Sequence, residues 1–171
     1  MSVENLQEKA RSIVGSATQE EKEIIFIWMQ VLQEKFAGDI LRQVVPKRFD
    51  VERSKNGSKK DSGTLVCEIT VTEEMSNGYH NMHGGCSAYL VDLCTSLLLS
   101  AFMRSHVSLN LNVDYHLPVP VGTTIEIVST TRALGKRVLS TRCEFIHKEK
   151  RTLLVSGSHL KMPPSETPAK L

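Results

Sequence analysis

Residues 84–104 are apolar on nearly every side, and this stretch constrains the fold more than any other feature of the chain. It lacks strand-like alternation and is rich in helix formers, which predicts a helix that must be buried. Four runs of strand character follow at residues 106–117, 123–133, 137–148 and 151–161, separated by turn residues. We therefore expect an α+β fold in which an antiparallel sheet wraps around one central helix.

The residues before this helix predict further elements. Thr18 is typical of a helix N-cap, and apolar residues then recur at spacings of three and four until Gly38-Asp39 stops the pattern. Residues 1–18 are polar and weakly periodic, so we expect a loosely held arm there. Residues 64–72 alternate and are β-branched, which predicts a strand, and a short strand is also expected at residues 49–52.

A length of 171 residues suits a single domain with its own core. We divide the chain into an N-terminal arm and helix over residues 1–45, the main domain over residues 46–162 and a flexible tail over residues 163–171. The tail begins at Pro163-Pro164, and no internal repeat indicates a second domain.

Charge, hydropathy and cysteine usage argue against several classes of protein. Lys and Arg number 21 against 19 Asp and Glu, and the pI of 8.4 lies below the value of about 9 that is usual for nucleic-acid binders. The longest apolar stretch, residues 88–103, is too short to span a bilayer. The four cysteines lack the spacing of a metal site or a disulfide framework, which favours a reducing compartment. We expect no nucleic acid, membrane or metal as a partner.

The segment from Asn77 to Asp92 contains the main candidate functional residues. Gly84-Gly85 opens the predicted buried helix, and glycines there leave backbone N–H groups open to approach. Such a helix start attracts negative charge, including the oxyanion that forms when a carbonyl is attacked. Asp92 follows among aliphatic residues, where a carboxylate is costly unless it is paired or needed. From these residues alone, a tight turn and a hydrogen-bonded Asp92 explain the pattern equally well.

The same segment resembles the PaaI branch of the hotdog-fold acyl-CoA thioesterases, the 4HBT-like thioesterase superfamily. In that family an Asn stands six residues before a His-Gly-Gly turn, and an acid stands nine residues beyond the His. Asn77, His83 and Asp92 hold both spacings. Residues 107–118 are similar to the family's next strand, and the likeness runs from about residue 64 to residue 161.

The resemblance implies a single hotdog domain over residues 46–162, preceded by an extra N-terminal helix. It also implies a homodimer that pairs edge to edge, often within a dimer-of-dimers tetramer. In such dimers the His-Gly-Gly turn of one subunit faces the acid of its partner. The strand pattern agrees, because an isolated copy would leave a strand edge exposed.

The family's site residues can be carried over to matching positions. Asp92 would act as general base or as nucleophile, and the sequence does not separate these roles. The Gly84 N–H, with that of Gly85, would polarise the thioester carbonyl. Asn77 would orient the water or the carbonyl. His83 either holds the turn or takes part directly, and we favour the turn.

Further candidates lie downstream. Ser108 would hydrogen-bond the acid or the water, with Asn110 as a competitor for that position. Lys136 and Arg137 match the place where a basic residue of the family lies near CoA, although exposed hairpins often carry Lys for solubility alone. Lys161 is a weaker candidate for a CoA contact.

The implied function is hydrolysis of acyl-CoA to free acid and CoA, with CoA as part of the substrate and no separate cofactor. A non-catalytic acyl-CoA-binding or sensing hotdog module is the alternative, and a hotdog dehydratase or hydratase is a weaker one. Tyr89, Leu93 and Phe102 would line an acyl tunnel or simply pack in the core.

The last residues, Ala169, Lys170 and Leu171, resemble a variant of the Ser-Lys-Leu address that the peroxisomal import receptor reads. We expect the peroxisome as location, with cytoplasm or mitochondrion as alternatives.

Overall fold

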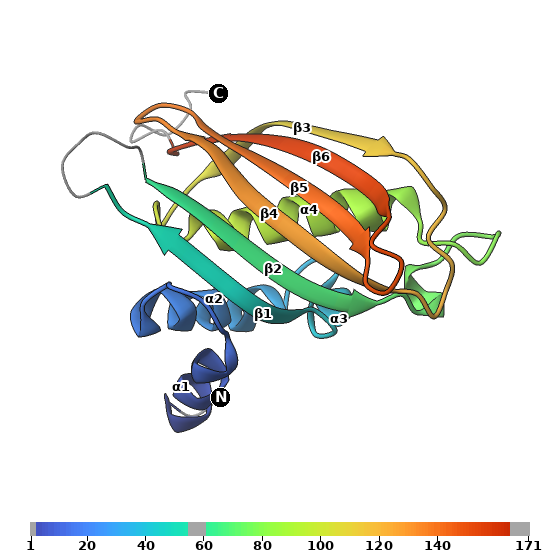
Figure 1. The fold of residues 1–171 in the computed structure, drawn as a ribbon, viewed down its shortest axis with the longest axis horizontal. Coiled ribbons are helices and arrows are strands. Elements are labelled where there is room, and N and C mark those ends of the chain that lie inside the picture. Colours follow the sequence, from blue (N-terminus) through green and yellow to red (C-terminus); the bar gives the residue numbers. More distant parts are fainter. Residues whose placement is uncertain (1–2, 55–60, 165–171) are drawn as a thin grey trace.

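The computed structural model describes residues 3–54 and 61–164. Six strands and one central helix form the main body, and three shorter helices precede the sheet (Figure 1). In chain order the elements are α1 (Val3–Ser12), α2 (Gln19–Leu32), α3 (Gly38–Leu41), β1 (Val45–Glu52), β2 (Ser62–Thr70), the 3-10 turn η1 (Glu73–Met75), α4 (Gly84–Leu99), β3 (Val107–Tyr115), β4 (Thr124–Leu134), β5 (Leu139–His147) and β6 (Leu153–Met162).

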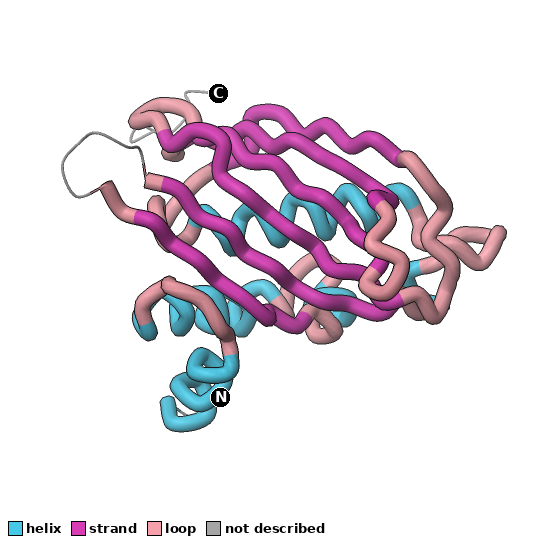
Figure 2. The backbone as a smooth tube through the Cα atoms, viewed as in Figure 1, coloured by secondary structure: helices cyan, strands magenta, loops and turns pink. Residues whose placement is uncertain are grey.

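The strands form one antiparallel sheet in the order β1-β2-β4-β5-β6-β3, and this sheet curves around α4 (Figure 2). The predicted α+β hotdog architecture is confirmed. Leu90, Val91 and Leu98 have no exposed surface, as expected for a helix that is apolar on most sides. The helix ends at Leu99, earlier than predicted, with Ser100 as its C-cap residue.

The predicted loosely held arm is wrong, because the N-terminal residues form α1 and attach to the sheet. Ala10 is fully buried and Ile13 is 1% exposed. Beyond the helix, the Val14 N–H donates to the Lys47 carbonyl at 3.0 Å, and the Phe49 N–H donates to the Val14 carbonyl at 2.8 Å. A few apolar residues are therefore enough to hold this segment along the outer edge of β1.

The predicted start of α2 is confirmed, but its end is not. The Thr18 hydroxyl accepts from the Glu21 N–H at 3.2 Å, and the Glu21 carboxylate accepts from the Thr18 N–H at 2.8 Å, which completes a capping box. The helix ends at Leu32, and Gly38 begins α3 instead of stopping α2. A Cβ at Gly38 would lie 1.9 Å from the Gln33 carbonyl oxygen, so this close approach of two backbone segments requires glycine.

The two edges of the sheet differ in what covers them. The N-terminal segment bonds along β1, whereas β3 pairs with β6 on one side and with no other strand in the described part of the chain. Apolar side chains on this open edge are partly exposed, among them Val107, Leu109 and Leu111 at 46%, 51% and 37%. Exposed strand edges with apolar side chains are typical of surfaces where sheets pair.

The predicted peroxisomal address at Ala169, Lys170 and Leu171 lies outside the described residues and stays a prediction. Among the helices of residues 3–54 and 61–164, none combines the length and hydrophobicity that a membrane crossing needs. Cys67, Cys94 and Cys143 are free thiols that are fully buried in the core.

Candidate active site

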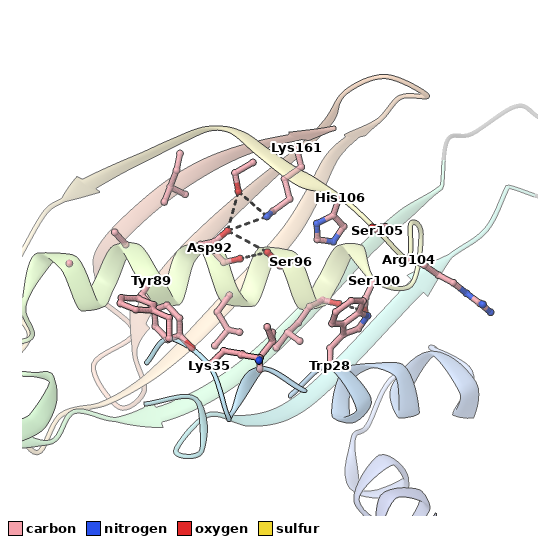
Figure 3. Close-up of a pocket in the computed structure, with 18 residues that line it drawn as sticks. Trp28, Lys35, Tyr89, Asp92, Ser96, Ser100, Arg104, Ser105, His106 and Lys161 are labelled. Carbon is pink, nitrogen blue, oxygen red and sulfur yellow. Dashed lines mark hydrogen bonds and ion pairs between the residues drawn. The ribbon is translucent and has the colours of Figure 1, made fainter. Parts of the chain in front are cut away.

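Asp92 lies in the middle of α4 and faces a cavity of about 610 Å³ between α4 and α2 (Figure 3). The carboxylate is 44% exposed, so it is less buried than its aliphatic neighbours in the sequence suggested. The reason is helical geometry, because Leu90 and Val91 point to the core while Asp92 points toward the cavity. The wall of this cavity is largely apolar and includes Trp28, Leu32, Phe36, Tyr89, Leu93 and Leu97.

The polar neighbours of Asp92 all approach the same carboxylate oxygen. Oδ1 lies 3.1 Å from Lys161 Nζ, 3.4 Å from Ser96 Oγ and 3.5 Å from Ser108 Oγ. His159 Nε2 is also 3.5 Å from Oδ1. Within the described residues, Oδ2 has no hydrogen-bond partner, so this oxygen is free to act on a molecule in the cavity.

Two of these neighbours, His159 and Lys161, were not assigned to the site from sequence. Both lie on β6, and their side chains are 0% and 4% exposed. The Lys161 ammonium is therefore turned inward to Asp92 and is not available to CoA phosphates at the surface. The sequence could have indicated this placement. Side chains alternate between the two faces of a strand, so His159 and Lys161 lie on the same buried face of β6 as Val155 and Gly157.

The hydrogen bonds around His159 define its protonation. The Thr95 hydroxyl donates to the Val91 carbonyl at 2.7 Å, so at 2.8 Å it accepts from His159 Nδ1–H. His159 Nε2 then carries no proton and accepts from the Ser108 hydroxyl at 3.0 Å. Burial, followed by the charge of Lys161, lowers the pKa of His159 to about 4, which agrees with a neutral ring at pH 7.

A bulge in β3 explains why Ser108, and not Asn110, meets Asp92. Ser108 is opposite Lys161 and Asn110 is opposite Leu160, so Leu109 is the extra residue. The bulge places Ser108 on the same face as Leu111, which also lines the cavity, whereas regular alternation would put these two residues on opposite faces. Bulges often re-aim a side chain beside a functional site.

The start of α4 is organised around His83. His83 is the N-cap, and its Nδ1 accepts from the Gly85 N–H at 2.9 Å. The Gly84 carbonyl accepts from the Tyr115 hydroxyl at 2.9 Å, which ties the helix start to the end of β3. No residue of the described chain accepts a hydrogen bond from the Gly84 N–H. This donor is thus available, while that of Gly85 is used by the turn.

Asn77 lies near Gly84 but away from Asp92. Its side-chain oxygen accepts from the N–H groups of Tyr79 at 2.9 Å and Asn81 at 3.4 Å, which shapes the preceding loop. Asn77 and Gly84 line a second cavity of about 670 Å³. At about 1.5 Å per residue, Gly84 is about 12 Å along the helix from Asp92. One chain therefore places the acid and the free helix N–H too far apart to act on one carbonyl.

The remaining predicted residues lie in different places. Lys136 and Arg137 are exposed at the turn between β4 and β5 and line neither cavity. Tyr89 and Leu93 line the first cavity, and their role in an acyl tunnel stays a prediction. Phe102 does not, since it packs under the Arg53 guanidinium at 4.8 Å.

A sheet wrapped around a helix that carries a glycine-rich start and an acid at mid-length defines a hotdog-fold protein of the thioesterase type. The sequence model of the thioesterase superfamily matches residues 79–154. The chain belongs to this family.

Individual relatives support this assignment. Human acyl-coenzyme A thioesterase 13 is 32% identical over 101 residues, which cover 58% of this chain and 72% of that protein. An esterase-like protein of Caenorhabditis elegans is 33% identical over 97 residues, which cover 56% of this chain and 57% of the relative. The crystal structure of zebrafish thioesterase superfamily member 2 has the same fold, with a TM-score of 0.68 at 22% identity. It matches 87% of this chain and 100% of the zebrafish chain.

Proposed function

We propose that this protein hydrolyses acyl-CoA thioesters to a free acid and CoA, with Asp92 as the group that attacks or activates water. The observation that carries the proposal is the Asp92 carboxylate, which lines a largely apolar cavity and whose Oδ2 has no hydrogen-bond partner among the described residues. A cavity of about 610 Å³ beside this oxygen has the size of a small-molecule site. The human relative is named as an acyl-CoA thioesterase, which agrees with this substrate.

A complete site in this proposal needs two copies of the chain. The free N–H of Gly84 is about 12 Å from Asp92 along the helix of one copy, whereas an oxyanion donor must lie within about 3 Å of the reacting oxygen. The open edge of β3 offers the surface on which a second copy would pair. We take the functional unit to be at least a homodimer.

The ends of β3 indicate how such a dimer would complete the site. Tyr115 contacts Gly84 near one end of the strand, and Ser108 contacts Asp92 near the other. If two β3 strands pair antiparallel about a twofold axis near Leu111, Tyr115 of one copy comes opposite Ser108 of the other. The free Gly84 N–H of each copy would then approach the partner's Asp92.

The proposed reaction uses each group in a defined role. In the general-base route, Asp92 Oδ2 takes a proton from water while the water oxygen bonds to the thioester carbon. The Gly84 N–H from the other copy donates to the carbonyl oxygen as negative charge develops there. The carbon–sulfur bond then breaks, and CoA leaves as a thiolate. In the nucleophilic route, Oδ2 bonds to the carbon, the carbon–sulfur bond breaks and CoA leaves as a thiolate, and water then hydrolyses the resulting anhydride to the free acid and Asp92.

Substrate binding follows from the same cavity. The acyl chain would lie between α2 and α4 against Trp28, Phe36 and Leu93. Asn77 would orient the carbonyl from the side of the helix start. Lys136 and Arg137 remain proposals for CoA phosphate contacts, since a hairpin of one copy can reach a ligand bound at a dimer interface.

Release of the CoA thiol by the purified chain tests the proposal. Asp92→Asn should lower kcat by about 10²–10⁴-fold, since it removes the base or nucleophile with almost no change in shape. Asp39→Asn is the matched control, because Asp39 is an exposed carboxylate paired with Arg42 outside both cavities, and it should keep wild-type activity. Binding of acyl-CoA without turnover in the wild type would instead indicate the non-catalytic binding module.

A further inference from the structure

We propose that Lys161 is the positioning residue of this site, whose buried ammonium holds the Asp92 carboxylate through Oδ1, so that Oδ2 is the oxygen that acts. The inference rests on the proposed function, which supplies the reaction. It adds Lys161, a residue of β6, to a site that α4 and β3 otherwise form.

Lys161 is built into the fold as a buried charge. Its side chain is 4% exposed, and Nζ donates to Asp92 Oδ1 at 3.1 Å and to Ser108 Oγ at 3.2 Å. Burying an ammonium costs several kcal/mol unless an opposite charge and hydrogen bonds offset it. Surface lysines avoid this cost, so an inward lysine indicates a specific role at the carboxylate it meets.

Lys161 is the main hydrogen-bond donor to Asp92 Oδ1. The Ser96 hydroxyl has one hydrogen, and it donates to the Asp92 main-chain carbonyl at 2.6 Å in preference to Oδ1 at 3.4 Å. The Ser108 hydrogen goes to His159 Nε2, and that nitrogen itself carries no proton. Among the described residues, the Lys161 ammonium thus makes the shortest hydrogen bond to Oδ1, at 3.1 Å.

Removal of this ammonium would leave Oδ1 with long contacts only. Ser96 Oγ, Ser108 Oγ and His159 Nε2 lie 3.4 or 3.5 Å from this oxygen, whereas Lys161 Nζ lies at 3.1 Å. A carboxylate held by such weak contacts can rotate about its side-chain bonds. The ion pair with Lys161 therefore controls the orientation of Asp92.

Other titratable groups that face Asp92 do not replace Lys161. Burial first, and then Lys161, lowers the pKa of His106, which favours its neutral form. Burial raises the pKa of Tyr89 to about 12, so it is neutral as well. Lys35 and Arg104 line the same cavity but are exposed, where water and salt screen their charge.

Lys161→Met tests the inference through the separate effects on kcat and KM. The variant removes charge and donor while it keeps an unbranched side chain of similar length. We expect kcat to fall about 10²-fold with little change in KM, because the carboxylate is no longer held in place while the binding cavity is kept. Lys148→Met is the matched control, since it removes a lysine that pairs with Glu68 at 2.7 Å on the surface, and its kcat and KM should match the wild type.

A second measurement does not depend on turnover or on a lysine variant. Ion pairing is reciprocal, so Asp92→Asn should lower the pH at which the Lys161 ammonium titrates, as followed by nitrogen NMR of the side chain. The attraction of Asp92 opposes the lowering of the Lys161 pKa by burial, which is the physical basis of this expectation. An unchanged Lys161 titration in Asp92→Asn would overturn the inference, even for a wild type that hydrolyses no thioester.

The two proposals fail in different ways. A wild-type chain that releases no CoA contradicts the proposed function alone. A wild type that is active, an Asp92→Asn variant that is not, and a Lys161→Met variant with the wild-type kcat would contradict the inference about Lys161 alone.

Discussion

Gly84 offers a test of the proposed oxyanion donor, because proline is compatible with the first position of a helix and replaces the N–H hydrogen with a ring carbon. His83, with φ −64° and ψ 136°, already has the backbone conformation that a residue before proline adopts. We expect Gly84→Pro to lower kcat about 10²–10³-fold, the usual effect of losing one such donor. Steady-state kinetics with a thioester substrate measures this loss.

Gly84→Ala is the control for this substitution. It keeps the N–H and adds a Cβ 3.3 Å from the Tyr115 hydroxyl, the end of a side chain that can shift. This variant should retain most of the wild-type kcat. Equal losses in the proline and alanine variants would mean that crowding near Tyr115, and not the missing donor, is the cause.

At the scale of residues, the sequence indicated Asp92, Ser108 and the turn at His83 to Gly85, but it did not indicate the residues of β6 that support the acid. Spacing along one helix gives the separation of Asp92 from Gly84. Lys161 and His159 come from a strand that is distant in sequence, and the β3 bulge through which Ser108 reaches Asp92 was not predicted. Strand register and bulges depend on tertiary pairing, so hydrophobic periodicity alone does not reveal them.

At the scale of elements, α2 acts as one wall of the cavity, and we expect it to govern the preference for acyl chain length. Each methylene buried against Trp28 and Phe36 should raise kcat/KM about fourfold, from about 0.8 kcal/mol per methylene. Trp28→Ala should flatten this rise for longer acyl chains and leave acetyl-CoA unaffected. A series of acyl-CoA substrates of increasing length provides the measurement.

Ile27 supplies the matched control for this prediction. It is the neighbour of Trp28 on α2, is 48% exposed and does not line the cavity. Ile27→Ala should keep the wild-type dependence on chain length. A Trp28→Ala variant whose dependence is also unchanged would show that the acyl group binds elsewhere.

The elements themselves were predictable to different degrees. The central helix and the strands after it follow from strong, long patterns, and each appears within a few residues of its predicted bounds. The helix α1 was missed because its short apolar face is recognisable only once Ala10 and Ile13 are packed. Gly38 was wrongly predicted to end the helix. A glycine is needed there because the backbone of Gln33 lies too close for a side chain, and this contact is not visible in the sequence.

At the scale of the whole molecule, the separation of Gly84 from Asp92 is the feature that demands an assembly. The sequence suggested a dimer through family resemblance and the prospect of an open strand edge. The structure adds a physical contrast, since residues 14–17 bond along β1 while β3 stays open. In our account, the open edge both joins two copies and completes two active sites.

Mixed dimers of two inactive variants test this account most directly. Asp92→Asn and Gly84→Pro, co-expressed with different tags and purified as the heterodimer, would form one site with both defects and one with neither. The account predicts about half of the wild-type activity from this heterodimer, although each variant alone is nearly inactive. A heterodimer as inactive as its parents would place the acid and the helix N–H in the same subunit and contradict the central claim.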